Sequence, residues 1–154
     1  MAQFLLITTL LSIAGLIATS IAGFMASPGH VAQHIFFALA TVVIGLFSQS
    51  MTMFFFIGTG RQLKDKTAGS AAEAAVKQAT RAMAMKVSPA ATYAMAMLMI
   101  TFIMGGGVGS GKTPLWLHLT LSAATVLLYA RAYWIEIRAM NENARLMDKY
   151  LRDD

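Results

Sequence analysis

Cysteine is absent from this 154-residue chain, so disulfide bonds, thiolate metal sites and a catalytic cysteine are all excluded. Charge is also scarce. Only 12% of the residues are charged, against about a quarter in ordinary soluble domains, whereas 57% are hydrophobic. This balance excludes both a disordered chain and a typical soluble domain.

Acidic residues are the scarcest charged type, with 7 Asp and Glu against 12 Lys and Arg. None of the seven falls within the long apolar runs, so paired-carboxylate catalysis and a carboxylate proton relay have no candidates. The sequence also lacks Glu-x-x-His and His-Glu-x-x-His, the spacings of di-iron and zinc sites. We therefore expect a protein that is not an enzyme.

Four apolar runs have the length of membrane-crossing helices. The first, residues 4–25, is uncharged for 22 residues, or about 33 Å as a helix. It is not expected to be a cleaved signal peptide, because no basic residue precedes it. We predict an all-α polytopic membrane protein, a single domain of four transmembrane helices arranged as two tandem helical hairpins. The expected spans are about 4–26, 31–58, 89–107 and 115–135.

Short local signals set these boundaries. The Ser-Pro-Gly of residues 27–29 breaks the chain between the first two runs. Ser88 followed by Pro89 is typical of a helix start, with a capping side chain and proline in the first turn. The glycines at 105–107 are expected to end the third helix.

The basic residues gather in two segments. Six lie between residues 61 and 86 and five in the tail from residue 131, whereas the other two connections hold only Lys112. The positive-inside rule then predicts that both termini and the middle loop lie in the cytoplasm. We expect the membrane to be the plasma (inner) membrane. Since the positive charge is a topology signal, we expect no nucleic-acid partner.

Both basic segments are expected to form helices beyond the membrane, over about 62–87 and 136–152. Apolar residues of the tail recur at heptad spacing, which predicts that the tail helix packs on the helix before the third span. They are Tyr133, Ile137, Met140, Ala144, Met147 and Leu151. Arg131 and Glu136 fall near the predicted inner interface, where long side chains reach water, so neither is expected to need a buried partner.

The second and fourth runs resemble each other. Superposing His34 on His118 brings residues 40–42 (Ala-Thr-Val) onto residues 124–126 without a gap. This match predicts an internal duplication, with a pseudo-symmetry axis along the membrane normal because both hairpins share one orientation. The two histidines would then lie at equal depth near the outer surface.

His34 and His118 are the candidate cofactor ligands, because ionisable groups inside a membrane usually have a function. Thr41 and Thr125 each follow a histidine by seven residues and share its helix face, and Gly45 extends that face. Two histidines at one depth of a four-helix bundle suit axial ligation of the iron of a b-type haem. The predicted metal ligands are His34 and His118, and the predicted cofactor-binding residues add Thr41, Thr125 and Gly45.

Two other interpretations of these side chains remain open. Each histidine could donate a hydrogen bond across a helix contact and bind nothing. A copper site would have to use the 12 methionines, but Met95, Met97 and Met99 alternate by two and cannot share one helix face.

Residues 106–113 match G-x-x-x-x-G-K-[ST], the phosphate-binding loop of nucleotide hydrolases. That loop works between a strand and a helix, in the compartment that holds the nucleotide. Here no strand is predicted before it, and the predicted topology puts it outside. We therefore expect a glycine-rich turn and no nucleotide partner.

Two functional hypotheses follow. The first is a haem-binding electron-transfer protein or subunit. The second is a non-catalytic accessory subunit of a larger membrane complex, which would contact copies of itself or other membrane subunits through its helix faces and C-terminal helix. Transport is the least favoured class, because no charged residue is predicted to lie inside the membrane.

Overall fold

The computed structural model describes residues 1–25 and 30–151, and this part of the chain is all-helical. It contains α1 (Ala2–Phe24), α2 (Val31–Thr67), α3 (Glu73–Gly109) and α4 (Leu115–Leu151). All four are long and apolar enough to cross a membrane. The expected all-α class and the expected count of four such helices are therefore confirmed.

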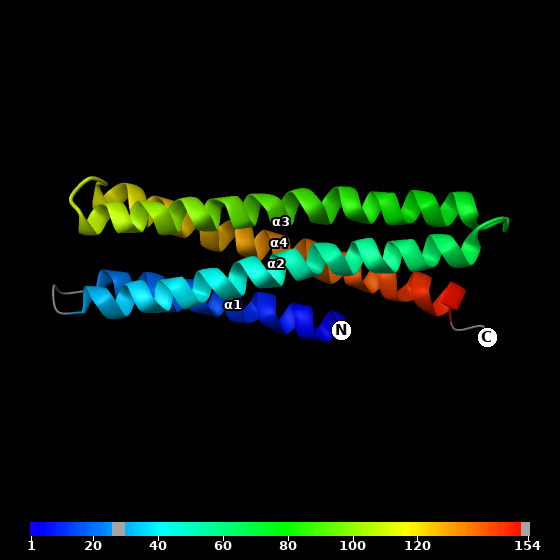
Figure 1. The fold of residues 1–154 in the computed structure, drawn as a ribbon, viewed down its shortest axis with the longest axis horizontal. Helices are drawn as coiled ribbons and strands as arrows, with labels where there is room; N and C mark the ends of the chain where they lie inside the picture. Colours follow the sequence, from blue (N-terminus) through cyan, green and yellow to red (C-terminus); the bar gives the residue numbers. More distant parts are fainter. Residues whose placement is uncertain (26–29, 152–154) are drawn as a thin grey trace.

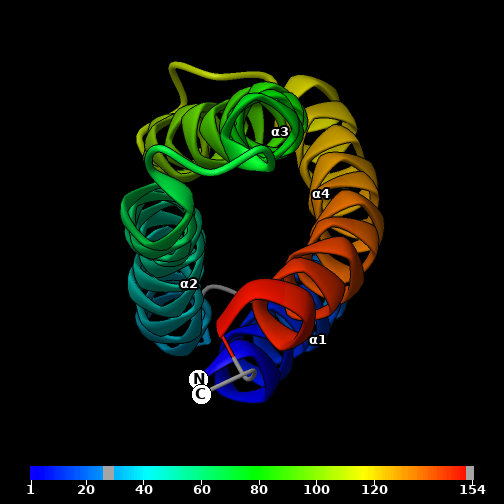
Figure 2. The same ribbon diagram turned by 90° about the vertical axis from the view of Figure 1, so that its right-hand side faces the viewer.

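The four helices pack side by side as one elongated bundle (Figure 1). Each packs on the next in the sequence, and α1 also packs on α4, so the helices form a ring when viewed end-on (Figure 2). We call the end with residues 30 and 110–114 the histidine end, and the opposite end, with the 68–72 turn, the basic end. Because α1 has 23 residues and the others 37, α1 stops short of the basic end.

Two predicted helix boundaries near the basic end are wrong. The expected separate helix over 62–87 is divided between the end of α2, a turn at 68–72 and the start of α3. Gly69 makes this turn with a left-handed φ of 74°, and its N–H donates to the Glu73 carboxylate at 2.8 Å. The alanine-rich residues after the turn favour helix strongly, so α3 is already formed when the chain reaches Pro89.

Pro89 consequently lies inside α3 instead of at its start. It removes one backbone donor, but Val87 and Ala91 beside it are buried in the bundle and hold the helix in place. The glycines at 105–107 are helical too, because α3 continues to Gly109 and turns only at Gly111, where φ is 70°. The predicted break at 27–29 lies outside the described residues.

The tail is the second half of α4, without the expected boundary at residue 136. As predicted it packs on the first half of α3, with Met140 in one cluster with Met83 and Val87. Its buried face is rotated from the predicted stripe, since Ala144 is exposed and Asn143 is buried. The buried residues Ala132, Glu136, Ala139 and Asn143 keep the alternating four- and three-residue spacing of the predicted stripe, but each precedes a predicted position by one residue, so the buried face is turned by about 100°.

Two apolar clusters fill the bundle interior, and a polar layer separates them. The first, towards the basic end, contains Leu5, Phe56, Met83, Val87, Ala139 and Met140. The second, towards the histidine end, contains Leu16, Val42, Ala94, Leu98, Tyr129 and Ala132. Between them along the helices lie the buried side chains of Thr9, Ser12, Ser48, Gln49, Thr52 and Glu136.

The pattern of buried positions repeats along the chain. In α1 and α3 it repeats with a shift of 82 residues, which pairs Leu5, Thr9, Ser12 and Leu16 with Val87, Ala91, Ala94 and Leu98. In α2 and α4 the shift is 84 residues, which pairs Thr41, Gly45, Ser48, Thr52, Phe56 and Thr59 with Thr125, Tyr129, Ala132, Glu136, Met140 and Asn143. The second shift is the one that superposes His34 on His118.

Candidate functional site

His34 and His118 each lie against a glycine of the preceding helix. A Cβ atom on Gly23 would lie 3.0 Å from Cε1 of His34, and one on Gly105 would lie 2.8 Å from Cε1 of His118. Both distances are shorter than ordinary carbon contacts. Glycine at these two positions is therefore what allows each imidazole ring to approach the neighbouring backbone.

His34 is the fourth residue of α2 and His118 is the fourth residue of α4, so both lie in the first turn of their helices at the histidine end. The Nδ1 atoms of both rings are buried and have no hydrogen-bond partner. Buried ring nitrogens nearly always form a hydrogen bond in native structures. Two buried Nδ1 atoms without a partner, at the same end of the bundle, therefore need an explanation. The structure thus places both sequence-predicted ligands at the same end of the bundle, and each has a ring nitrogen that makes no hydrogen bond.

Thr41 and Thr125 lie further from the histidine end and are already engaged. The Thr41 hydroxyl meets that of Thr19 at 3.3 Å, and the Thr125 hydroxyl meets that of Thr101 at 2.7 Å. Gly45 faces Leu98 and the Tyr129 hydroxyl, each 2.8 Å from the position of a Cβ. These three residues join neighbouring helices, and the space next to Gly45 is filled by a tyrosine.

A short hydrogen bond joins α1 to α4 just inside the histidine level. Ser20 Oγ and Ser122 Oγ are 2.6 Å apart. Ser122 follows His118 by four residues and Ser20 precedes Gly23 by three, so this contact lies about one turn inward. Any group held between the histidines must therefore lie at the end of the bundle, outside the Ser20–Ser122 contact.

The polar layer contains a residue that sequence reasoning misjudged. Glu136 is only 1% exposed, so the expectation that it reaches water at the interface is wrong, whereas Arg131 is exposed as expected. Thr9 Oγ1 donates to Glu136 Oε2 at 3.2 Å and also meets Ser48 Oγ at 2.7 Å. A signal was present in the sequence: Glu136 follows Thr125 by eleven residues, or about three turns, on the same face.

Several buried polar atoms of this layer have no hydrogen-bond partner. Glu136 Oε1, both amide atoms of Gln49 and the Thr52 hydroxyl are buried without a partner in hydrogen-bonding geometry, although Gln49 lies beside the Glu136 carboxyl. Within residues 1–25 and 30–151, no lysine, arginine or histidine forms an ion pair with Glu136. An uncompensated carboxylate in an apolar interior costs several kcal/mol, so this layer needs a proton or a cation at Glu136.

The glycine-rich match at 106–113 has a different backbone from a phosphate-binding loop. Residues 106–109 are the last turn of α3. The N–H groups of Gly111, Lys112 and Thr113 donate to the carbonyls of Val108 and Gly107 at 2.9–3.1 Å. Amides already engaged with the backbone are not directed at a phosphate, which agrees with the predicted glycine-rich turn.

Comparison with known proteins found no matching family, no similar curated protein and no similar solved structure. In the described residues, no three His, Asp or Glu side chains gather as metal ligands. Function must therefore be inferred from the histidine pair and the polar layer.

Proposed function

We propose that this chain is an integral membrane protein of the plasma (inner) membrane, with both termini and the 68–72 turn in the cytoplasm. The large apolar side chains that cover its surface support this placement, since they would be costly in water. They include Phe36, Phe37, Phe47, Phe54, Ile103 and Leu127. The gathering of basic residues at one end supports the orientation.

We further propose that the bundle consists of two tandem hairpins, α1–α2 and α3–α4, that arose by duplication. The repeated burial pattern supports this. So do two pairs of equivalent contacts, in which Thr19–Thr41 corresponds to Thr101–Thr125 and the Gly23–His34 packing corresponds to Gly105–His118. A pseudo-two-fold axis along the bundle would relate the two halves.

Within this bundle, we propose that His34 and His118 ligate one b-type haem, which makes the protein an electron-transfer protein or subunit. The observation that carries the proposal is the pair of histidines at one end of the bundle, each packed against a glycine and each with a buried Nδ1 atom that has no hydrogen-bond partner. A bound haem would supply one-electron transfer. Gly23 and Gly105 would set the ring positions, and the Ser20–Ser122 contact would close the bundle below them. Thr41, Thr125 and Gly45 would act only through helix packing.

An absorption spectrum of the purified protein, oxidised and then reduced with dithionite, tests the haem proposal. We expect a sharp reduced α-band that disappears in His34→Ala and in His118→Ala. His30→Ala is the matched control, because His30 is exposed at the start of α2, and it should keep the band. A colourless wild-type protein from haem-replete cells contradicts the proposal.

A colourless protein would leave the accessory-subunit hypothesis, which the exposed apolar faces and the C-terminal half of α4 also support. In that case the protein should purify in mild detergent as part of a larger assembly of fixed stoichiometry. A stable monomer would count against it.

The burial of Glu136 supports a second candidate function, binding of a small monovalent cation in the polar layer. Transport ranks last in the sequence interpretation because no charge is expected inside the membrane, but the structure buries the carboxyl of Glu136 in the bundle interior. Glu136 Oε1, Gln49 Oε1 and the Thr52 hydroxyl are unmatched oxygen atoms, and hard cations prefer oxygen ligands. One carboxylate balances one positive charge.

Thermal melts in detergent test this second candidate. A ligand that binds only the folded state raises its stability, by about 2.7 kcal/mol at one hundred times its dissociation constant. We expect Na⁺ or Li⁺ to raise the Tm above its value in choline, and Glu136→Gln to abolish the difference. Glu142→Gln, on an exposed face of the same helix, should retain it. A wild-type Tm that is the same in all these cations contradicts the candidate.

A further inference from the structure

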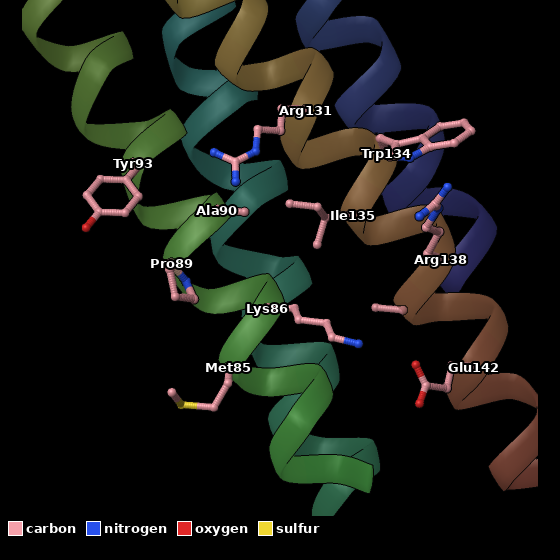
Figure 3. Close-up of a pocket in the computed structure, with 11 residues that line it drawn as sticks. Met85, Lys86, Pro89, Ala90, Tyr93, Arg131, Trp134, Ile135, Arg138 and Glu142 are labelled. Atoms are coloured by element: carbon pink, nitrogen blue, oxygen red, sulfur yellow. The ribbon is translucent and has the colours of Figure 1, made fainter.

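A groove of about 430 Å³ runs between α3 and α4, near the middle of both helices. Figure 3 shows side chains from both helices around it, with Lys86 and Tyr93 on α3 and Arg131, Trp134 and Arg138 on α4. The groove lies apart from the histidine pair and from the polar layer, and it opens to the outside of the bundle. It is the place where the apolar surface meets the basic end.

The groove carries an excess of positive charge. Lys86, Arg131 and Arg138 line it, and the only acidic side chain on its wall is Glu142. In the described part of the chain none of the three cations is within ion-pair distance of a carboxylate. Their charges are therefore available to an anionic ligand.

Its aromatic residues fix the position of the charge. The Arg138 guanidinium lies over the Trp134 ring, 4.7 Å from the ring centre, which orders a side chain that would otherwise be mobile. Tyr93 projects from α3 at the apolar end of the groove, with its ring directed away from α4 (Figure 3). Tryptophan and tyrosine beside basic residues are typical of the level of lipid head groups.

The depth of the groove agrees with that level. Leu5, near the start of α1, packs in one cluster with Ala139 and Met140, so the N-terminus of α1 lies level with Arg138. Arg131 is seven residues, or about 10 Å, further into the apolar half. The cations thus extend from the end of the apolar surface inward, as the phosphate and glycerol region of a lipid does.

We propose that this groove binds the head group of an anionic phospholipid. The phosphate is held by the positive charges of Lys86, Arg131 and Arg138, which all line the groove. An acyl chain continues past Tyr93 along the apolar wall. This inference rests on the proposed membrane placement, and it adds a specific lipid site to it.

Native mass spectrometry of the purified protein, titrated with phosphatidylglycerol or phosphatidylcholine, tests the inference. We expect one phosphatidylglycerol to bind more tightly than phosphatidylcholine. The double variant Arg131→Gln/Arg138→Gln should bind it roughly thirtyfold more weakly, from about 1 kcal/mol per removed charge. The control, Lys64→Gln/Arg145→Gln, removes two exposed cations of the basic end outside the groove and should bind like the wild type.

Three outcomes would overturn the inference: no preference for phosphatidylglycerol, an equal loss in the control, or displacement of the lipid by a soluble acidic peptide that binds more tightly. The measurement in detergent does not depend on the direction of insertion. A failed lipid site is therefore distinguishable from a wrong topology, which accessibility labelling at Ser70 and Ser110 examines separately.

Discussion

Thr9 is the residue through which the polar layer joins three helices. Its hydroxyl contacts Ser48 of α2 and Glu136 of α4, and its side chain is fully buried. Thr9→Val keeps the shape of the side chain but removes the hydroxyl, so Ser48 and Glu136 each lose a hydrogen-bond partner. We expect a loss of about 1–2 kcal/mol of stability, measured as a lower Tm in detergent.

Thr8→Val is the control for that change. The Thr8 hydroxyl bonds only to the carbonyl of Leu5 in its own helix, so its loss should lower the Tm much less. Equal effects of the two substitutions would mean that the inter-helix hydrogen bonds of Thr9 contribute nothing measurable.

Replacing either of two adjacent glycines in α3 with alanine should change the stability of the protein in opposite directions. An added methyl at Gly105 would lie 2.8 Å from the His118 ring, so Gly105→Ala must displace the imidazole and should destabilise the protein by about 1–3 kcal/mol. Gly106 has open space around it, and Gly106→Ala should gain about 0.5–1 kcal/mol of helix stability. Thermal melts of the two variants check the sign of each effect, and a stabilising Gly105→Ala would contradict the packing of His118.

At the residue scale, the position on a helix face is the sequence signal that agrees best with the structure. The shared register of His34 and His118 predicts equal positions along the bundle, and both lie in the first turn of their helices at the same end. Glu136 was missed because it was judged by its place in the chain next to basic residues. Judged by its helix face, three turns after Thr125, it would have been placed in the interior.

At the scale of elements, the contact between α1 and α4 is the one that closes the ring. Ser20 and Ser122 are 102 residues apart in sequence, and their hydroxyl oxygens are 2.6 Å apart. Because the chain has no cysteine, the double variant Ser20→Cys/Ser122→Cys can form only this disulfide within one molecule. We expect mild oxidation to form it readily and to raise the Tm, with faster migration on a non-reducing gel as the readout.

The control pairs Ser20→Cys with Thr120→Cys. Thr120 is exposed and bonds to the carbonyl of Trp116, so its side chain points away from α1. Crosslinking of this pair as fast as the first would indicate that α1 and α4 slide or rotate freely.

The number and type of elements could be predicted from apolar runs, but their ends could not. Pro89 and the glycines at 105–107 are strong local signals of a helix boundary, yet α3 passes through both. Burial of Val87, Ala91, Ala94 and Leu98 along one face holds the helix together there. Local propensity is a weak prior, and tertiary packing over ten turns outweighs it.

At the scale of the whole molecule, the proposed orientation predicts which turns reagents can reach. Ser70 and Ser110 are both exposed and lie in turns at opposite ends of the bundle. A membrane-impermeant maleimide added to intact cells should label Ser110→Cys and spare Ser70→Cys. Labelling of Ser70→Cys alone would reverse the topology.

The two halves of the molecule contribute different residues to the polar layer, so the order of synthesis decides which of them is in place first. Glu136 belongs to the second half, while Thr9, Ser48 and Gln49 beside it all belong to the first. During synthesis from the N-terminus, α1 and α2 are complete before Glu136 has been added. The first hairpin therefore acts as a template that receives the carboxyl as α4 emerges, and a fragment that begins after residue 72 would have to bury Glu136 without its partners.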